Sequence, residues 1–366
     1  MKILAPLNSP AETEMLLANG AEELYCGLVP EEWVARYSGA IWLNRRSPAG
    51  GNLRTFSDLA RVVEQAHGRS VPVFVTLNAQ TYTAGQLPLV LDLARRYVEE
   101  AGADGLIVSD PALILQLAEQ DLPCALHLSS IAASLNVAAV RFFQSLGVRR
   151  VILPRSLTLA EIGRIAREIG SQVELEVFIL NDGCIFEEGF CLTTHHPSVG
   201  AFCVGLARME SQSFKLCGTP WAREEEEEIN TLLQDFHHRI DGLTNHACSA
   251  PAQTALPLAP CGLCSIPAFH RMGISAVKIV GREASSLRKL ASLRLVRAVV
   301  EKARNGALEE DVQVYAQTLR ESVAPCVPGE MCYHDAGATT SRTQSARERG
   351  TMEIAASTPS SVGRRL

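Results

Sequence analysis

Short apolar segments alternate with longer amphipathic ones along most of the chain. The short segments are rich in β-branched and aliphatic residues and are bounded by turn-forming residues, which predicts β-strands. Between them, apolar residues at helical spacing, as in 87–101 and 159–169, predict helices. The eight predicted strands are residues 2–7, 23–28, 72–78, 105–110, 125–129, 150–154, 174–180 and 276–281.

The order of these elements favours a closed barrel. Eight strands in strict alternation with helices are typical of a (β/α)8, TIM-like barrel of the α/β class, whereas an open doubly wound sheet usually has fewer strands. No GxGxxG sequence follows the first strand, which argues against a dinucleotide-binding fold. Each of four glycines ends a helical segment just before a strand, as expected for the left-handed residue that terminates a helix: Gly20, Gly102, Gly147 and Gly273.

One long interruption separates the seventh strand from the eighth. Residues 181–260 exceed an ordinary connecting loop and so require a functional explanation. We therefore expect a barrel over residues 1–305 that carries a cysteine-rich, cluster-binding insertion, 181–264, between strands 7 and 8. A helical extension is predicted for residues 306–334. The last residues, 335–366, are rich in Ser, Thr, Ala and Arg with little apolar pattern, which predicts a disordered tail.

Composition narrows the class of protein. The 366 residues are 47% hydrophobic and 20% charged, which provides enough apolar material for a packed core. The net charge of −6 counts against a surface that coats nucleic acid, so a nucleic-acid partner is not expected, although a local basic groove stays open. No stretch of about 18 apolar residues occurs, and Pro6 interrupts the start before a signal peptide is complete. We expect a cytoplasmic protein without a membrane span.

The cysteines carry most of the chemical information. Seven of the eleven fall between positions 184 and 264. Cys184 comes four residues after the seventh strand, at the end of the barrel where the active sites of this fold lie. In a reducing compartment, clustered thiols are more often metal ligands or catalysts than disulfides.

Two interpretations of the individual cysteines compete. A cysteine in an apolar run is usually a small buried residue, and this interpretation is preferred for Cys124, Cys326 and Cys332. Four soft thiolates can hold either an iron–sulfur cluster or a structural zinc ion, and spacing alone leaves both open. The four candidates that stand among Gly, Asp, Glu and Pro are Cys184, Cys191, Cys261 and Cys264.

Polar residues at the ends of other strands are further candidates. Arg155 follows the sixth strand and Arg282 the eighth, so their guanidinium groups would clamp a carboxylate or phosphate of an anionic substrate or co-substrate. Ordinary surface ion pairs are the alternative for both. His127 ends the fifth strand, where barrel catalysts sit, but a histidine satisfied in the core is an equal alternative.

The stretch from Glu176 to Cys191 resembles the signature of the collagenase-like peptidase family U32. That signature has Glu, Phe, Cys, Gly and Cys at the relative positions of Glu176, Phe178, Cys184, Gly189 and Cys191. Residues 151–155 and 277–282 resemble two further blocks of the family, and the likeness covers about residues 1–305. The chain departs from the pattern at Asn181-Asp182-Gly183 and at Val280, which bears on the subfamily and its substrate more than on the fold.

The resemblance implies an iron–sulfur protein that acts in oxygen-independent hydroxylation, either of ubiquinone precursors or of RNA bases. By position, Cys184 and Cys191 would be the first two ligands of a [4Fe-4S] cluster, and the sequence Gly-Ala-Phe before Cys203 resembles the surroundings of the third. The fourth ligand does not transfer cleanly. Cys261 or Cys264 is preferred, Cys261 first, with Cys217 and Cys248 in reserve. A structural zinc ion is the alternative cofactor.

The preferred function is a redox-linked hydroxylation of an aromatic or heterocyclic acceptor, and a related protein of the same family is a possible hetero-partner. Three other classes of function compete with it. A peptidase with a cysteine nucleophile is the runner-up, although the chain has no HExxH and no GxSxG sequence. The sequence also leaves open an RNA-base hydroxylation factor and a non-catalytic, zinc-stabilised partner protein.

Overall fold

The structure is a computed structural model that describes most of the barrel and parts of the insertion. It covers residues 1–37, 42–46, 48, 50–120, 122–181, 183–184, 188–191, 195–196, 200–201, 223–225, 227, 257, 260–323, 326 and 332–334. The predictions made for Cys203, Cys217, Cys248 and the tail from 335 to 366 lie outside the described residues.

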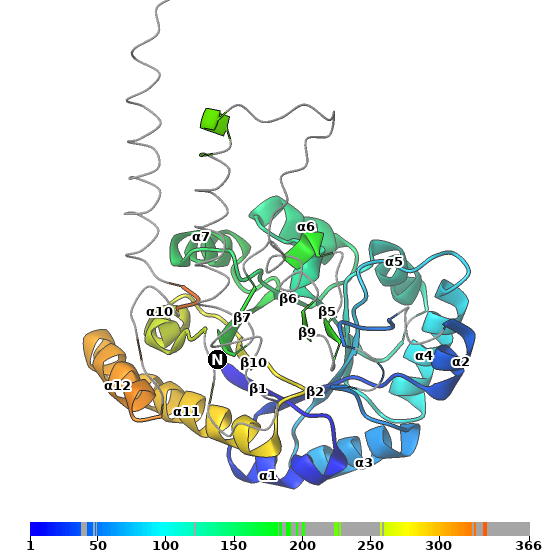
Figure 1. The fold of residues 1–366 in the computed structure, drawn as a ribbon, viewed down its shortest axis with the longest axis horizontal. Coiled ribbons are helices and arrows are strands. Elements are labelled where there is room, and N and C mark those ends of the chain that lie inside the picture. The colour runs from blue at the N-terminus through cyan, green and yellow to red at the C-terminus, as the bar shows by residue number, and fades with distance from the viewer. Residues whose placement is uncertain are drawn as a thin grey trace, which may run out of the picture.

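Eight parallel strands close into a barrel (Figure 1). Around the barrel they run in the order β1-β10-β7-β6-β5-β4-β3-β2, so each strand pairs with its neighbour in the chain and β1 closes against β10. All eight predicted strands are present, and the predicted (β/α)8 barrel is confirmed. The strands are β1 (Lys2–Pro6), β2 (Glu23–Cys26), β3 (Val73–Leu77), β4 (Gly105–Val108), β5 (Ala125–Leu128), β6 (Arg150–Ile152), β7 (Glu174–Leu180) and β10 (Ala276–Ile279).

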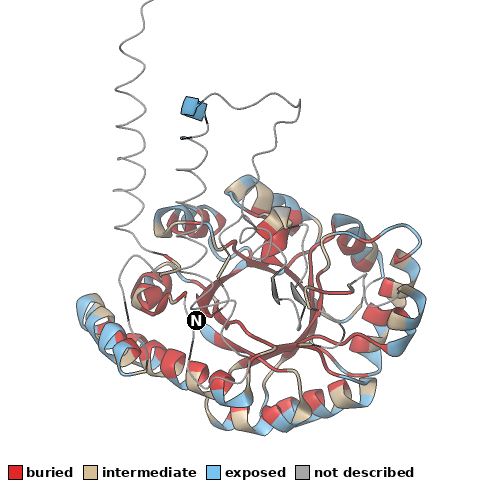
Figure 2. Ribbon diagram, viewed as in Figure 1, coloured by how far each residue is buried: buried red, intermediate tan, exposed pale blue. Residues whose placement is uncertain are grey.

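Helices surround the ring of strands, with buried inner faces and exposed outer faces (Figure 2). Local sequence fixes where they begin: in α7, for example, Thr158 and Glu161 form a reciprocal capping box. None of the described helices is long and apolar enough to cross a membrane. The α-helices are α1 (Thr13–Ala18), α2 (Glu31–Tyr37), α3 (Phe56–His67), α4 (Leu87–Glu99), α5 (Pro111–Glu119), α6 (Val137–Ser145), α7 (Leu159–Ile169), α10 (Ile266–Arg271), α11 (Ser286–Arg304) and α12 (Glu309–Glu321).

Tight turns connect several helices to the strands that follow. The four glycines predicted to end helices have positive φ angles of 97°, 76°, 92° and 75°, a backbone conformation that costs glycine little. Short 3-10 turns provide further connections: η1 (Pro10–Glu12), η2 (Ser130–Ala132), η3 (Glu188–Phe190) and η5 (Leu263–Ser265). Between β7 and β10 in sequence, β8 (His195–His196) and β9 (Gly200–Ala201) form an antiparallel pair separate from the barrel.

The barrel has two hydrophobic regions. The larger one lies between the strands and the helices, and the smaller one fills the inside of the barrel. Inward and outward positions alternate along each strand, as expected for a closed barrel. The interior cluster contains Leu4, Tyr25, Phe74, Ile107, Ile152, Phe178 and Val280.

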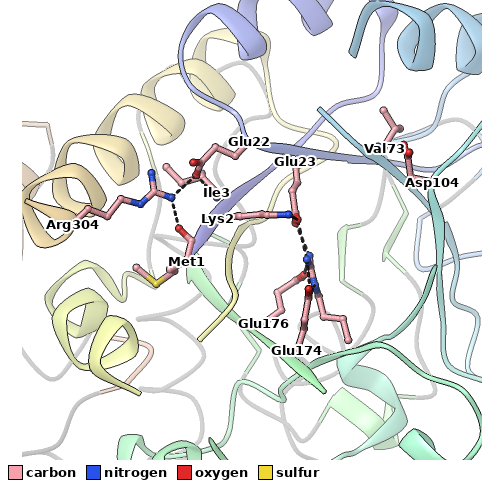
Figure 3. A network of polar contacts seen from close by, with 11 residues as sticks. Met1, Lys2, Ile3, Glu22, Glu23, Val73, Asp104, Glu174, Glu176 and Arg304 are labelled. Atoms are coloured by element: carbon pink, nitrogen blue, oxygen red, sulfur yellow. Dashed lines mark hydrogen bonds and ion pairs between the residues drawn. The ribbon is translucent and has the colours of Figure 1, made fainter. Parts of the chain in front are cut away.

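Charged side chains share the barrel interior with this cluster. Arg150 donates hydrogen bonds to Glu23 and Glu176, which are fully buried, and to the half-exposed Glu174. Lys278 lies 3.0 Å from Glu176, and Lys2 lies 3.1 Å from Glu23. Figure 3 shows Lys2 of β1 reaching Glu23 of β2, with Glu174 and Glu176 of β7 on the other side of the same network. Each of the two buried carboxylates is therefore paired with two cations.

Candidate functional site

The loops at the carboxyl ends of the strands bring several predicted residues to one face of the barrel. Cys184 lies four residues beyond β7, Arg155 three residues beyond β6 and Arg282 three residues beyond β10. Asn78 follows β3 directly, and its side-chain amide donates a 3.0 Å hydrogen bond to Ser129, which follows β5. These ends lie on one side of a parallel barrel, where active sites of this fold are formed.

Three contacts attach residues 188–191, at the end of the signature, to this face. Glu188 forms an ion pair with Arg155 and also accepts a 3.2 Å hydrogen bond from the Arg155 backbone N–H. Gln80, just beyond β3, donates its side-chain amide to the Gly189 carbonyl. Because the attachments come from the loops after two different strands, the segment is held across the mouth of the barrel.

A close approach explains the glycine of the signature. A Cβ atom on Gly189 would lie 2.6 Å from the Cβ of Ala133, which is closer than two carbon atoms can pack. Ala133 itself follows η2 and has a positive φ of 54°, so the two turns meet in a constrained arrangement. Position 189 therefore needs glycine for packing, and its peptide is then free to meet Gln80.

An arginine side chain is hydrogen-bonded to one of the two signature thiols. Arg45 Nη2 donates a 2.9 Å hydrogen bond to Cys191 Sγ, and both Cys184 and Cys191 are half-buried. The Arg45 backbone N–H donates to Asn78 Oδ1 at 3.4 Å, which ties this loop to β3. A guanidinium group favours the ionised form of a neighbouring thiol, and the thiolate is the form that binds metals. The two signature thiols, Cys184 and Cys191, thus fit a soft metal centre. Cys203, the predicted third ligand, lies outside the described residues.

Arg282 is the more unusual of the two predicted arginines. Its guanidinium is 5% exposed and contacts neutral partners, with a 2.8 Å hydrogen bond to Thr76 Oγ1 and longer ones to Asn44 and Asn52. Among the described residues, no carboxylate lies within ion-pair distance of it. Burial lowers the pKa of Arg282 to about 10, so the group is still a cation at neutral pH. A Cβ on Gly27 would collide with Nη1, so glycine there makes room for the guanidinium.

Arg155 is arranged differently, although it stands at the matching position on β6. Its charge is compensated by Glu188, and its guanidinium lies 3.7 Å from the centre of the Phe178 ring. The ion pair of Arg155 with Glu188 therefore supports the signature loop, by which we mean residues 188–191. Of the two arginines predicted to clamp an anion, only Arg282 lacks a compensating carboxylate in the part of the chain that the structure describes.

His127 lies inside the barrel. It is 3% exposed and packs on Phe74, with ring centroids 4.3 Å apart, and its Nδ1 atom has no hydrogen-bond partner among the described residues. Burial first, and then the charges of Arg150, Lys278 and Lys2, lower the pKa of His127 well below 6.5. The imidazole is therefore neutral in the folded protein, and its role as a catalyst stays a prediction.

A pH dependence of stability follows from this buried histidine. Below about pH 6.5 the unfolded chain binds a proton at position 127 while the folded chain does not, so stability falls as pH decreases, by up to about 1.4 kcal/mol per pH unit. We expect His127→Phe to reduce this slope between about pH 6.5 and 5, measured by urea unfolding. His270→Gln, at an exposed position, is the control and should keep the wild-type slope. An unchanged slope in His127→Phe would show that the imidazole is protonated when folded.

The remaining described cysteines of the insertion have unexpected neighbours. Cys261 forms a parallel β-bridge with Cys332, and Cys264 is close enough to Cys326 and Cys332 for their charges to act on it. Cys326 and Cys332 are half-buried, and their interpretation as packing residues stays a prediction.

Neither set of thiols is already arranged around a common centre. Within the described ranges, no three His, Cys, Asp or Glu side chains form a group that could hold a metal ion as they stand. For the signature thiols, the third predicted ligand, Cys203, lies outside those ranges. The assignment of ligands is therefore still a prediction.

Comparisons with known proteins agree with the signature. The sequence model described as "Peptidase family U32" matches residues 8–336. The tRNA hydroxylation protein P of Escherichia coli (strain K12) is 29% identical over 214 residues, which cover 57% of this chain and 43% of that protein. The tRNA hydroxylation protein P of Helicobacter pylori (strain J99 / ATCC 700824) is 25% identical over 310 residues, or 82% of this chain and 64% of that protein. The chain thus spans less than two thirds of the length of either relative.

A solved structure is also similar in part. The structure of the U32 peptidase Mk0906 aligns with a TM-score of 0.37 and 16% identity, covering 52% of this chain and 75% of that chain. The closed barrel itself, and not this alignment, establishes the fold.

Proposed function

Because this chain belongs to peptidase family U32, we propose that it takes part in the hydroxylation of a base in tRNA, using an iron–sulfur cluster. The observation that carries the proposal is the pair of half-buried thiols at the barrel mouth, Cys184 and Cys191, of which Cys191 accepts a hydrogen bond from Arg45. The buried guanidinium of Arg282 lies at the same end of the barrel. The names of the relatives support tRNA as the substrate class. They give no support to ubiquinone precursors, which the resemblance alone left open.

The cluster would be held by Cys184, Cys191 and Cys203, with Cys261 as the preferred fourth ligand. When bound, such a cluster supplies one-electron transfer. The chain's own residues have distinct tasks. Arg45 stabilises the Cys191 thiolate, and the Arg155–Glu188 pair keeps the signature loop across the barrel mouth.

Hydroxylation replaces a C–H bond of the base with C–OH. Without molecular oxygen, we propose that the oxygen atom comes from a donor molecule: R–H + X–OH gives R–OH + X–H, so the base is oxidised by two electrons and the donor is reduced by two. We propose that the donor is an organic anion whose carboxylate or phosphate binds Arg282. A buried guanidinium with neutral neighbours is suited to this, because an arriving anion compensates its charge and accepts two parallel hydrogen bonds.

Two measurements test the proposal. Anaerobically purified chain should contain iron and acid-labile sulfide, and Cys184→Ala and Cys191→Ala should each lower both by more than about tenfold, because each removes a thiolate ligand. Cys124→Ala, which removes a half-buried thiol at the entrance to β5, is the matched control and should leave both unchanged. In cells that lack the gene, tRNA should lack a nucleoside that is heavier by one oxygen atom, and the wild-type chain should restore it.

Several outcomes would count against the proposal. Full iron content in Cys184→Ala would remove that thiol from the cluster. Peptide hydrolysis that survives iron removal and is blocked by alkylation of Cys184 or Cys191 would support a peptidase instead. An unchanged set of tRNA nucleosides would exclude tRNA as the substrate without excluding the cluster.

A further inference from the structure

We propose that the buried guanidinium of Arg282 is a receptor for a single carboxylate group, and that Asn44 and Asn52 are positioning residues that leave its charge available. We call the guanidinium, these two amides and the Thr76 hydroxyl the Arg282 site. The inference rests on the proposed function, which places the oxygen donor at this site. It narrows the class of that donor from a carboxylate or phosphate to a carboxylate.

Two glycines allow the Arg282 site to be compact. A Cβ atom on Gly27 would lie 2.1 Å from Arg282 Nη1 and 2.3 Å from Asn52 Oδ1. A Cβ on Gly51 would lie 2.8 Å from the Cγ of Glu283, and Gly51 also has a positive φ of 67°, which glycine adopts at little cost. The connection after β2 therefore packs closely against the loop after β10, although the two are far apart in the sequence.

Neutral acceptors hold the guanidinium in place. Its Nη1 donates to Thr76 Oγ1 at 2.8 Å and to Asn52 Oδ1 at 3.5 Å, and its Nη2 donates to Asn44 Oδ1 at 3.4 Å. The Asn44 amide donates a 2.9 Å hydrogen bond to Asn52 Oδ1, so the two amides also fix each other. All four side chains are buried. An aspartate at position 44 or 52 would have nearly the same shape but would neutralise Arg282, so the amides are what preserve its charge.

Two donors of Arg282 are left for a ligand. A guanidinium has five N–H groups, and the three hydrogen bonds above leave one on Nε and one on Nη2 without an acceptor among the described residues. Nε and Nη2 share one edge of the planar group, where a carboxylate can accept two parallel hydrogen bonds. Arg282 follows β10 at the mouth of the barrel, which is where ligands of this fold bind.

The charges around the site favour a carboxylate over a phosphate. Arg46 and Glu283 both act on Arg282, but their charged groups lie 4.0 Å apart and offset each other. Lys289, on which the charge of Arg282 acts, pairs with Glu12 at 2.8 Å. These described groups sum to one positive charge. One carboxylate balances it, whereas a phosphate ester with about two negative charges at pH 7.5 leaves a buried charge without a partner.

Two other titratable neighbours of Arg282 are neutral. Burial raises the pKa of Cys26 to about 12, so this thiol keeps its proton at neutral pH. The Tyr25 hydroxyl donates a 3.1 Å hydrogen bond to the Ile279 carbonyl, so it is protonated as well. Neither residue changes the sum of charges.

The Arg282 site adjoins one of the signature thiols. Asn44 contacts Arg282, and the next residue, Arg45, donates to Cys191 Sγ. Because consecutive Cα atoms are only about 3.8 Å apart, one short segment contacts both groups. A carboxylate compound bound to Arg282 is therefore held close to a proposed ligand of the cluster.

Ligand binding to the anaerobically purified chain tests the inference. The probes are benzoate and phenyl phosphate, which share a ring and differ in the anionic group, and affinity is measured by titration calorimetry at pH 7.5. We expect benzoate to bind at least about tenfold more tightly than phenyl phosphate. Asn52→Asp should weaken benzoate binding at least about tenfold, because its carboxylate compensates Arg282. Asn136→Asp, the same change at the exposed N-cap of α6, is the matched control and should bind benzoate like the wild type.

A double-mutant cycle separates loss of the charge from loss of the fold. Asn52→Asp should keep the urea midpoint of the wild-type chain, because the new carboxylate pairs with Arg282. In the Arg282→Met background the same change should lower the midpoint, because the carboxylate is then buried without a partner. A purely structural role of Asn52 would lower the midpoint equally in both backgrounds and would contradict the inference.

The results for this site and for the proposed function can be told apart. The inference would be overturned by equal benzoate affinity of Asn52→Asp and the wild type, by phenyl phosphate binding as tightly as benzoate, or by no benzoate binding to the wild-type chain. These results leave tRNA hydroxylation intact, since it is read from nucleosides in cells. Conversely, an unchanged set of tRNA nucleosides together with benzoate bound through Arg282 would remove the role in hydroxylation and keep the carboxylate site.

Discussion

Arg150→Met should lower the free energy of unfolding by about 3–5 kcal/mol, because it leaves buried carboxylates without their main partner. Arg150 is 2% exposed and bonds to both Glu23 and Glu176, each fully buried. These carboxylates raise the pKa of Arg150 above its already high value, so the guanidinium is permanently charged. Lys278 and Lys2 would be the remaining cations, each in contact with one of the two carboxylates.

Equilibrium unfolding in urea, followed by circular dichroism, measures this loss. Arg95→Met is the matched control, because Arg95 forms ion pairs with Asp92 and Glu99 on the exposed surface of α4 and should leave the midpoint unchanged. Adding Glu23→Gln to Arg150→Met should recover part of the loss, since the buried charge on Glu23 then disappears and its other partner, Lys2, is half exposed. Equal midpoints for Arg150→Met and Arg95→Met would mean that the interior ion pairs contribute nothing to stability.

Unlike Arg150→Met, Arg282→Met should lose the hydroxylation activity and keep the free energy of unfolding of the wild-type chain. If Arg282 holds the anionic donor as proposed, removing its guanidinium should reduce formation of the hydroxylated nucleoside by about 100-fold or more. The free energy of unfolding should change by less than about 1 kcal/mol, because the contacts of this buried charge are with neutral side chains. Arg282→Lys should not restore activity, since an ammonium group cannot form the two parallel hydrogen bonds.

Two comparisons sharpen this prediction. Gly27→Ala keeps the charge but places a Cβ where the Arg282 guanidinium lies, so it should lower activity in the same direction. Arg36→Met, on the exposed surface of α2, is the control and should retain full activity. The readouts are the amount of hydroxylated nucleoside in tRNA from complemented cells and the thermal shift of the purified chain with organic anions. A normal thermal shift in Arg282→Met would place the anion elsewhere.

The fold could be predicted because its determinants are local. The alternation of apolar segments gives each strand, and the glycines that end helices mark several of the turns. Closure of the barrel follows from the number and order of the strands. The charged interior was not predicted: Arg150 and Glu23 stand in strands that look ordinary in sequence, and only closure of the ring brings β6 and β2 to face each other, with the two side chains 2.8 Å apart.

The site could be predicted only in part, for a physical reason. Position after a strand located Arg155 and Arg282 correctly, but whether each charge is compensated depends on residues such as Glu188, which reaches Arg155 from a different loop. The same limit applied to the thiols, because the parallel β-bridge that joins Cys261 to Cys332 is not indicated by any spacing in the sequence.

The contact between Gly189 and Ala133 makes the residue allowed at one of these positions depend on the residue at the other. Ala133 has a backbone conformation that glycine adopts with less strain, and its methyl group is what excludes a side chain at position 189. Glycine at 133 would relieve that strain and remove the closest clash of a Cβ at 189, leaving the Ala133 Cα and the Ile131 carbonyl oxygen each 3.3 Å away. The requirement for glycine at 189 thus depends on alanine at 133, and a substitution at 189 is expected only together with one at 133.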